Sequence, residues 1–132
     1  MPNVTKDATK IINETDYATL TTGASTTLAN CLPIDLTKAT SLVLMVKGTT
    51  VPGTITLTLY ASVDDADDAS YGTAPWNPNT VWATGWTHTT TVLLQHSPEI
   101  PVGPKYLKVM ATNDAGTSVE GLQVWAIVQT LG

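Results

Sequence analysis

The chain has 132 residues, of which 42% are hydrophobic and 13% charged, and its formal net charge is −5 at pH 7. This composition excludes generic disorder, and the length allows one domain with a real core but not two ordinary ones. All six cationic residues are lysines, and nucleic-acid binding depends on clustered lysine and arginine at the phosphates, so we expect no direct nucleic-acid partner.

The first fourteen residues are polar, lack helical periodicity, and contain Ile11 and Ile12 as their only apolar pair. They predict an extended N-terminal arm over residues 1–14, either mobile or laid on a partner, followed by a single domain over residues 15–132. Ile11 and Ile12 are therefore candidate partner contacts. The arm lacks the apolar stretch of a secretory signal and no apolar run of eighteen residues follows, so we expect cytoplasmic synthesis and no membrane segment.

Two threonine-rich strands are expected next, over residues 16–22 and 26–32, with a turn between them at residues 23–25. Pro33 ends the second strand or places it at a sheet edge, because proline cannot donate to a sheet ladder. We expect residues 34–36 to continue the strand after this kink.

The strand over residues 54–63 has the clearest pattern in the chain, since five apolar residues alternate with threonine, tyrosine and serine. This alternation predicts one buried face and one wetter face, near the middle of a sheet. Residues 41–47 are apolar on both faces, and a polar turn with glycine at both ends joins the two runs. The sequence therefore predicts an antiparallel hairpin of these two strands.

An acidic run opens the longest loop, over residues 64–79, and contains Asp64, Asp65, Asp67 and Asp68. Carboxylate oxygens are ligands that Ca²⁺ prefers, which makes the run a candidate calcium site. The glycine and distal glutamate of a full calcium loop are missing, and a solvated loop that opposes edge-to-edge aggregation explains the charges as well. We therefore expect no cofactor and keep calcium as the alternative.

Four further strands follow, over residues 81–86, 91–96, 105–112 and 121–129, with turns rich in glycine, proline and asparagine between them. About eight short strands and no convincing helix predict an all-β fold, namely a two-sheet antiparallel β-sandwich of jelly-roll type. An immunoglobulin-type sandwich is the alternative, although its Cys…Trp…Cys spacing is absent.

Aromatic side chains gather in and after the long loop, as Tyr71, Trp76, Trp82 and Trp86, with Tyr60 on the strand before it. Tryptophan and tyrosine dominate interface hot spots, so these residues are candidate partner contacts. Stacking on sugar rings and ordinary core packing are the two other interpretations.

No catalytic constellation is present in the sequence, and we expect no enzyme activity. Cys31 is the only cysteine, which excludes an intrachain disulfide and fits a small buried hydrophobic residue. His88 and His96 could approach each other across a hairpin, but no cysteine or carboxylate cluster completes a zinc site with them.

The chain resembles the head decoration, or cement, proteins of tailed bacteriophages. The polar stretch of residues 1–14, the long strand after the proline-rich turn at residues 100–104, and the closing segment over residues 121–128 carry the resemblance. It implies a homotrimer that binds the major capsid protein on the outside of the virion and stabilises the capsid by binding alone. A carbohydrate-binding module that uses exposed tryptophans, and a tail or neck component of a virion, are the alternatives.

Overall fold

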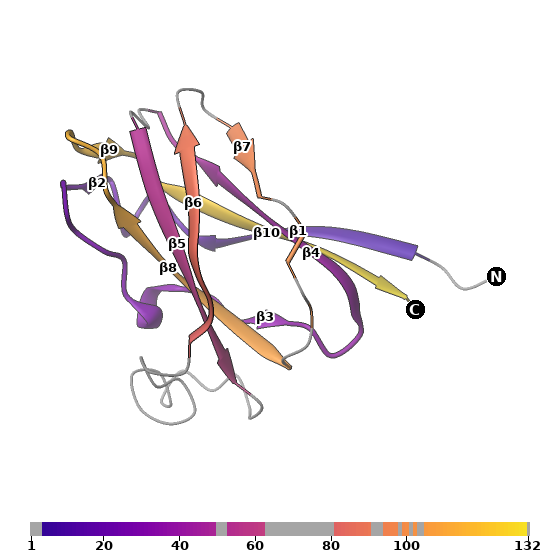
Figure 1. The fold of residues 1–132 in the computed structure, drawn as a ribbon. Coiled ribbons are helices and arrows are strands. Elements are labelled where there is room, and N and C mark those ends of the chain that lie inside the picture. Colours follow the sequence, from indigo (N-terminus) through magenta and orange to yellow (C-terminus); the bar gives the residue numbers. More distant parts are fainter. Residues whose placement is uncertain are drawn as a thin grey trace.

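The computed structural model describes residues 4–49, 53–62, 81–90, 94–97, 99–100, 102 and 105–131 (Figure 1). For residues 53, 61, 62, 81–90 and 94–96 it describes the backbone alone. The elements in chain order are β1 (Val4–Ile12), β2 (Thr19–Leu20), the 3₁₀ turn η1 (Leu28–Asn30), β3 (Ile34–Asp35), β4 (Ala39–Lys47), β5 (Gly53–Ser62), β6 (Val81–Thr90), β7 (Leu94–His96), β8 (Tyr106–Asn113), β9 (Val119–Glu120) and β10 (Gln123–Leu131).

The strands form three sheets, and every strand pair is antiparallel. Sheet A has the order β1-β10-β4-β7, sheet B is the pair β2-β9, and sheet C has the order β3-β8-β5-β6. The predicted all-β class is confirmed. In the part of the chain that the structure describes, no helix is long and apolar enough to cross a membrane.

One apolar core contains residues of both four-stranded sheets. Strand β5 turns its alternating residues Ile55, Leu57 and Leu59 inward, and all three are fully buried, as the sequence pattern predicts. Burial of one such side chain stabilises the fold by about 1.5–3 kcal/mol. Further members of the same core cluster come from β4, β8 and β10: Leu42, Leu44, Val46, Leu107, Val109, Ala111, Val124 and Ala126.

The predicted hairpin between residues 41–47 and 54–63 is wrong. Strand β4 pairs with β10 and β7, whereas β5 pairs with β8 and β6, so the two strands lie in different sheets. Each strand has an apolar face to bury, and placing the strands in opposite sheets lets both faces reach the same core. The expected position of residues 54–63 inside a sheet is confirmed, since β5 has a neighbour on each side.

The strands expected over residues 16–22 and 26–32 are also largely absent. Only β2 remains of the first, and the second contains η1 instead. Residues 24–26 run along the edge of β8, where the Thr26 N–H donates to the Ala111 carbonyl at 2.8 Å and Ala111 N–H donates to Thr26 Oγ1 at 2.9 Å. The segment therefore extends the edge beside β3 and does not form a strand of its own.

The predicted N-terminal arm forms β1 over most of its length. Strand β1 pairs with β10 from Val4 opposite Leu131 to Ile12 opposite Val124, with a register shift between Lys10 and Ile12. Because of this irregularity, consecutive residues Ile11 and Ile12 are both buried, with 2% and 0% of their surface exposed. They belong to the core of their own chain, which corrects their assignment as partner contacts.

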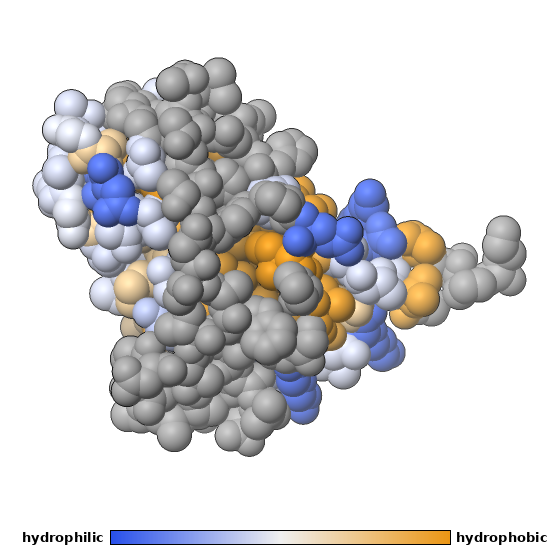
Figure 2. All heavy atoms as spheres, in the orientation of Figure 1, coloured by the Kyte–Doolittle hydropathy of each residue, from blue (hydrophilic) through white to orange (hydrophobic). Residues whose placement is uncertain are grey.

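The outer halves of β1 and β10 reach beyond the rest of the molecule, toward the two chain ends (Figure 1). All residues from Val4 to Thr9 are exposed. Hydrophobic surface is visible at this projecting end in Figure 2, where Val4 is 58% and Leu131 45% exposed. Strand β1 is thus anchored by its last two apolar residues and by its ladder with β10.

Replacing Ile12 with alanine should lower the free energy of unfolding by about 2–4 kcal/mol, because a fully buried side chain is truncated and a cavity remains. Urea denaturation followed by circular dichroism measures the change. The matched control is Thr9→Ala on the exposed part of the same strand, which should stay within about 0.5 kcal/mol of wild type. Equal stabilities of all three proteins would contradict β1 as an integral strand.

Candidate functional site

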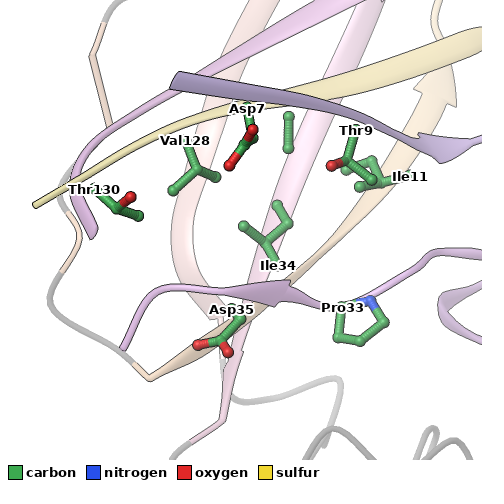
Figure 3. Close-up of a pocket in the computed structure, with 9 residues that line it drawn as sticks. Asp7, Thr9, Ile11, Pro33, Ile34, Asp35, Val128 and Thr130 are labelled. Atoms are coloured by element: carbon green, nitrogen blue, oxygen red, sulfur yellow. The ribbon is translucent and has the colours of Figure 1, made fainter. Parts of the chain in front are cut away.

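A groove lies between the inner side of the β1–β10 pair and strand β3 (Figure 3). Its volume is about 270 Å³. In Figure 3, side chains of β1 and β10 point into the groove from one side, and Ile34 of β3 points toward them from the other. The lining residues are Asp7, Thr9, Ile11, Pro33, Ile34, Asp35, Ala126, Val128 and Thr130.

The groove exists because sheet A is longer than sheet C on this side. Asp7 stands opposite Val128 in the β1–β10 ladder, where Asp7 is exposed and Val128 is half-buried against the edge of the core. Strand β3 is only two residues long and closes the space incompletely. A second hollow of about 310 Å³ shares Asp35 and Thr130 with the first, so the two adjoin along β3 toward Lys38.

The described lining of this groove combines apolar and polar side chains. Its apolar lining comes from Ile34, Val128 and Ala126, and its polar groups are two carboxylates and threonine hydroxyls. No aromatic ring or histidine lines either hollow among the residues described there. In the described ranges, no group of three or more histidine, cysteine, aspartate or glutamate side chains is placed to hold a metal ion.

One carboxylate at the groove has a fixed position and a shifted pKa. Asp35 Oδ1 accepts a hydrogen bond from the Thr37 backbone N–H at 2.9 Å, which shapes the turn after β3. Hydrogen bonds from the Thr37 side chain and backbone favour the charged form and lower the pKa of Asp35 below its usual value. The stability that this interaction contributes is present above the unfolded pKa and is lost as the pH falls through the folded one.

The described lining of this groove includes none of the tryptophans, tyrosines or loop aspartates singled out from the sequence. Trp82 and Trp86 belong to β6, for which the structure describes the backbone alone. Tyr71 and Trp76 lie outside the described residues, and so does the candidate calcium run of Asp64, Asp65, Asp67 and Asp68. These partner and calcium predictions therefore stay predictions.

The two histidines do not face each other across a hairpin. His88 lies on β6 opposite Ile55 in sheet C, whereas His96 lies on β7 opposite Met45 in sheet A. The predicted turn at residues 87–90 is part of β6, which continues to Thr90.

A buried lysine and the lone cysteine lie side by side under η1. Lys108 is fully buried, and its Nζ donates to the Leu28 carbonyl at 2.6 Å. Cys31 is 1% exposed, and its Sγ accepts from the Val109 N–H at 3.4 Å. Burial raises the pKa of the Cys31 thiol to about 11, although the Val109 hydrogen bond and the Lys108 charge act in the opposite direction. The thiol is therefore protonated at neutral pH, whereas a nucleophilic cysteine acts as the thiolate.

Sequence reasoning missed Asp7, Asp35 and Lys108. The aspartates had no signal, because one lies in a polar segment and the other beside a proline, where a solvated carboxylate is ordinary. Lys108 occupies the outward position of an alternating strand, which predicts exposure. Its burial depends on η1, which lies about eighty residues earlier and was expected to be a strand.

No protein-family model matches this chain, and no curated protein shows significant similarity to it.

Replacing Lys108 with alanine should cost about 2–4 kcal/mol of stability, since a buried side chain is lost and the Leu28 carbonyl keeps only the Cys31 backbone N–H as a donor. Lys108→Met retains most of the volume and should cost less, which separates packing from the hydrogen bond. The exposed Lys38→Ala is the control and should be nearly neutral. Urea titrations measure all three, and a neutral Lys108→Ala would show that η1 does not depend on this contact.

The Cys31 thiol should make stability fall between pH 9 and about 11. The thiol ionises near 9.0 in the unfolded chain but keeps its proton to about 11 when folded, so its contribution is present below pH 9 and lost above. The loss from this group is at most about 3 kcal/mol. Lysines and tyrosines titrate in the same range, so the measurement is the difference between wild type and Cys31→Ala. If the free energy of unfolding changed with pH in the same way in both proteins, the raised pKa of Cys31 would be refuted.

Proposed function

We propose that this chain is a non-enzymatic structural protein of a bacteriophage virion, which binds the outside of the capsid as a decoration protein and stabilises it. The observation that carries the proposal is the strand order. The eight strands of sheets A and C, numbered in chain order with β2 and β9 omitted, read 1-8-3-6 in one sheet and 2-7-4-5 in the other. This order supports a double-sheet jelly roll, an architecture used by viral capsid and lectin domains.

The finer fold assignment, a two-sheet sandwich of jelly-roll type, belongs to the same proposal. Its support is the shared core of sheets A and C and the path of the chain between them. Every connection between successive strands of the two sheets crosses from one sheet to the other, except that β5 and β6 pair directly. The short pair β2-β9 closes one end, where Asn113 Nδ2 donates to the Leu20 and Thr117 carbonyls at 2.9 Å.

A carbohydrate-binding module is the second candidate, because lectin domains share this architecture. The groove beneath β1 and β10 does not favour it, since the described lining offers no aromatic ring for a sugar to stack on. The tryptophans proposed for sugar binding lie outside the described residues or on β6, where the backbone alone is described. A tail or neck component of the virion would have the same fold, so only its location in the virion would distinguish it from a decoration protein.

Function by binding alone accounts for the form of the molecule. A rigid all-β body with a projecting β1–β10 pair can contact a capsid at several points without losing its fold. A homotrimer on the capsid would repeat each contact three times, and linked weak contacts give strong overall binding. The net charge of −5 favours solubility before assembly.

The test uses heads of the bacteriophage that encodes the chain, prepared without it and mixed with the purified protein. We expect the protein to sediment with the heads and to raise the temperature at which they release DNA, followed with a DNA-binding dye. A glycan array with the same protein is the parallel measurement. Heads that neither bind the protein nor gain heat resistance would refute the proposal, and specific glycan binding would then favour the second candidate.

A further inference from the structure

The outer face of sheet A, which points away from the core, carries an apolar strip across β4 and β10. The strip consists of Val43, Met45, Trp125 and Ile127, all half-buried. In the ladder Met45 stands opposite Trp125 and Val43 opposite Ile127, so the four side chains form one continuous surface. Ala8 of β1 stands opposite Ile127 and extends the strip toward the sheet edge.

The outer face of sheet C has a different character. Strand β5 places the half-buried Thr54, Thr56 and Thr58 on its outer side, and where this face is apolar, at Tyr60 and Met110, Leu28 of η1 packs on it. Strands β4 and β10 are instead apolar on both faces, a pattern typical of strands that are covered on both sides. The chain described here covers only the inner face of sheet A, so the pattern of β4 and β10 predicts a second cover.

Lysines surround the apolar strip on its outer side. Lys6 and Lys10 alternate with Ala8 along β1, and the exposed Lys47 ends β4, so three of the six lysines border this face. Lys10 Nζ lies 5.6 Å from the centre of the Trp125 ring and is 3.0 Å from Glu14 Oε2. An apolar centre with a charged rim is the usual anatomy of a protein interface.

The end of the molecule formed by β2 and β9 has the opposite charge. Asp16, Asp114 and Glu120 are exposed there, and the hydrogen-bond partners given by the structure for the last two side chains are the hydroxyls of Thr56 and Thr19. This end lies away from the projecting tips of β1 and β10 (Figure 1). A contact of sheet A with itself would bring lysines together, whereas a contact with this end would bring lysines to carboxylates.

We propose that a second copy of this chain covers the outer face of sheet A in a head-to-tail contact, with its β2–β9 end facing the lysine rim. The strip covers two side-chain positions along the strands and three strands across, so it measures about 14 Å by 14 Å, or roughly 200 Å². A stable interface buries about 800 Å² per partner, so the strip is the apolar centre and the lysine rim supplies the remainder. A head-to-tail contact uses two different surfaces, and it forms a ring such as the proposed homotrimer when the rotation between neighbouring copies closes.

The test is the native mass of the purified full chain, measured by light scattering across a concentration series at low and high salt. Wild type should self-associate, and high salt should weaken the association because it screens the lysine–carboxylate attraction. Ile127→Asp places a charge in the centre of the strip and should weaken association at least about tenfold. Lys6→Glu changes an exposed rim charge without touching the core and should weaken it about threefold to tenfold.

The matched control is Thr58→Asp, which introduces the same carboxylate on the outer face of sheet C and should associate like wild type. Melting curves of all variants show whether each is folded. A wild type that stays monomeric, or an Ile127→Asp variant that associates like wild type, overturns the proposal. Association that strengthens with salt overturns the head-to-tail arrangement, because like charges would then be in contact.

This inference rests on the homotrimer in the proposed function, but the two fail separately. A monomeric chain that still protects phage heads from heat overturns the second-copy contact and leaves the capsid function standing. If Ile127→Asp then loses head binding, the strip is the surface that meets the capsid. If the chain associates through the strip but does not bind heads, the capsid function is overturned and the second-copy contact stands.

Discussion

The whole architecture depends on burying alternate side chains of β4 and β5 in one core while the two strands lie in different sheets. A two-strand hairpin would have left both apolar faces on the same side of one sheet, with nothing opposite them. Placing Leu44 and Leu57 in separate sheets makes each strand the cover for the other. Once these strands are separated, β10 and β8 must fill the neighbouring positions in each sheet, which leaves β1 and β3 at the edges beside the groove.

Strands with strong alternation could be predicted well from the sequence, because the alternation of apolar and polar side chains is visible in consecutive residues. Strands β5, β8 and β10 lie close to their expected ranges, and Leu107, Val109 and Ala111 face the core as expected. Pairing could not be predicted in the same way. Which strand lies beside which depends on contacts between residues far apart in the chain, and the short five-residue link between β4 and β5 wrongly favoured a hairpin.

The groove and the buried lysine could not have been found from the sequence, since each depends on a distant segment. In the sequence alone, Asp7 is part of a polar arm and Lys108 occupies an outward strand position. The structure pairs Asp7 with β10 and covers Lys108 with η1. The apolar strip is the opposite case. Its signal, a run over residues 41–47 that is apolar on both faces, is visible in the sequence alone, and the structure adds that only one of these faces is covered.

The pairing of β1 with β10 also governs how this protein can fold as it is made. Val4 and Leu131 are ladder partners although nearly the whole described chain separates them. Among the described strands, β1 leaves the ribosome before all others, and β10, with which it pairs, leaves after all others. Until β10 is made, the backbone N–H and C=O groups of β1 that pair with it are hydrated. Long-range pairing of this kind slows folding and leaves a sheet edge open to aggregation. Charged side chains on an open strand edge oppose pairing with other chains, so we expect Lys6 and Lys10 of β1 to act against aggregation while the chain is being made.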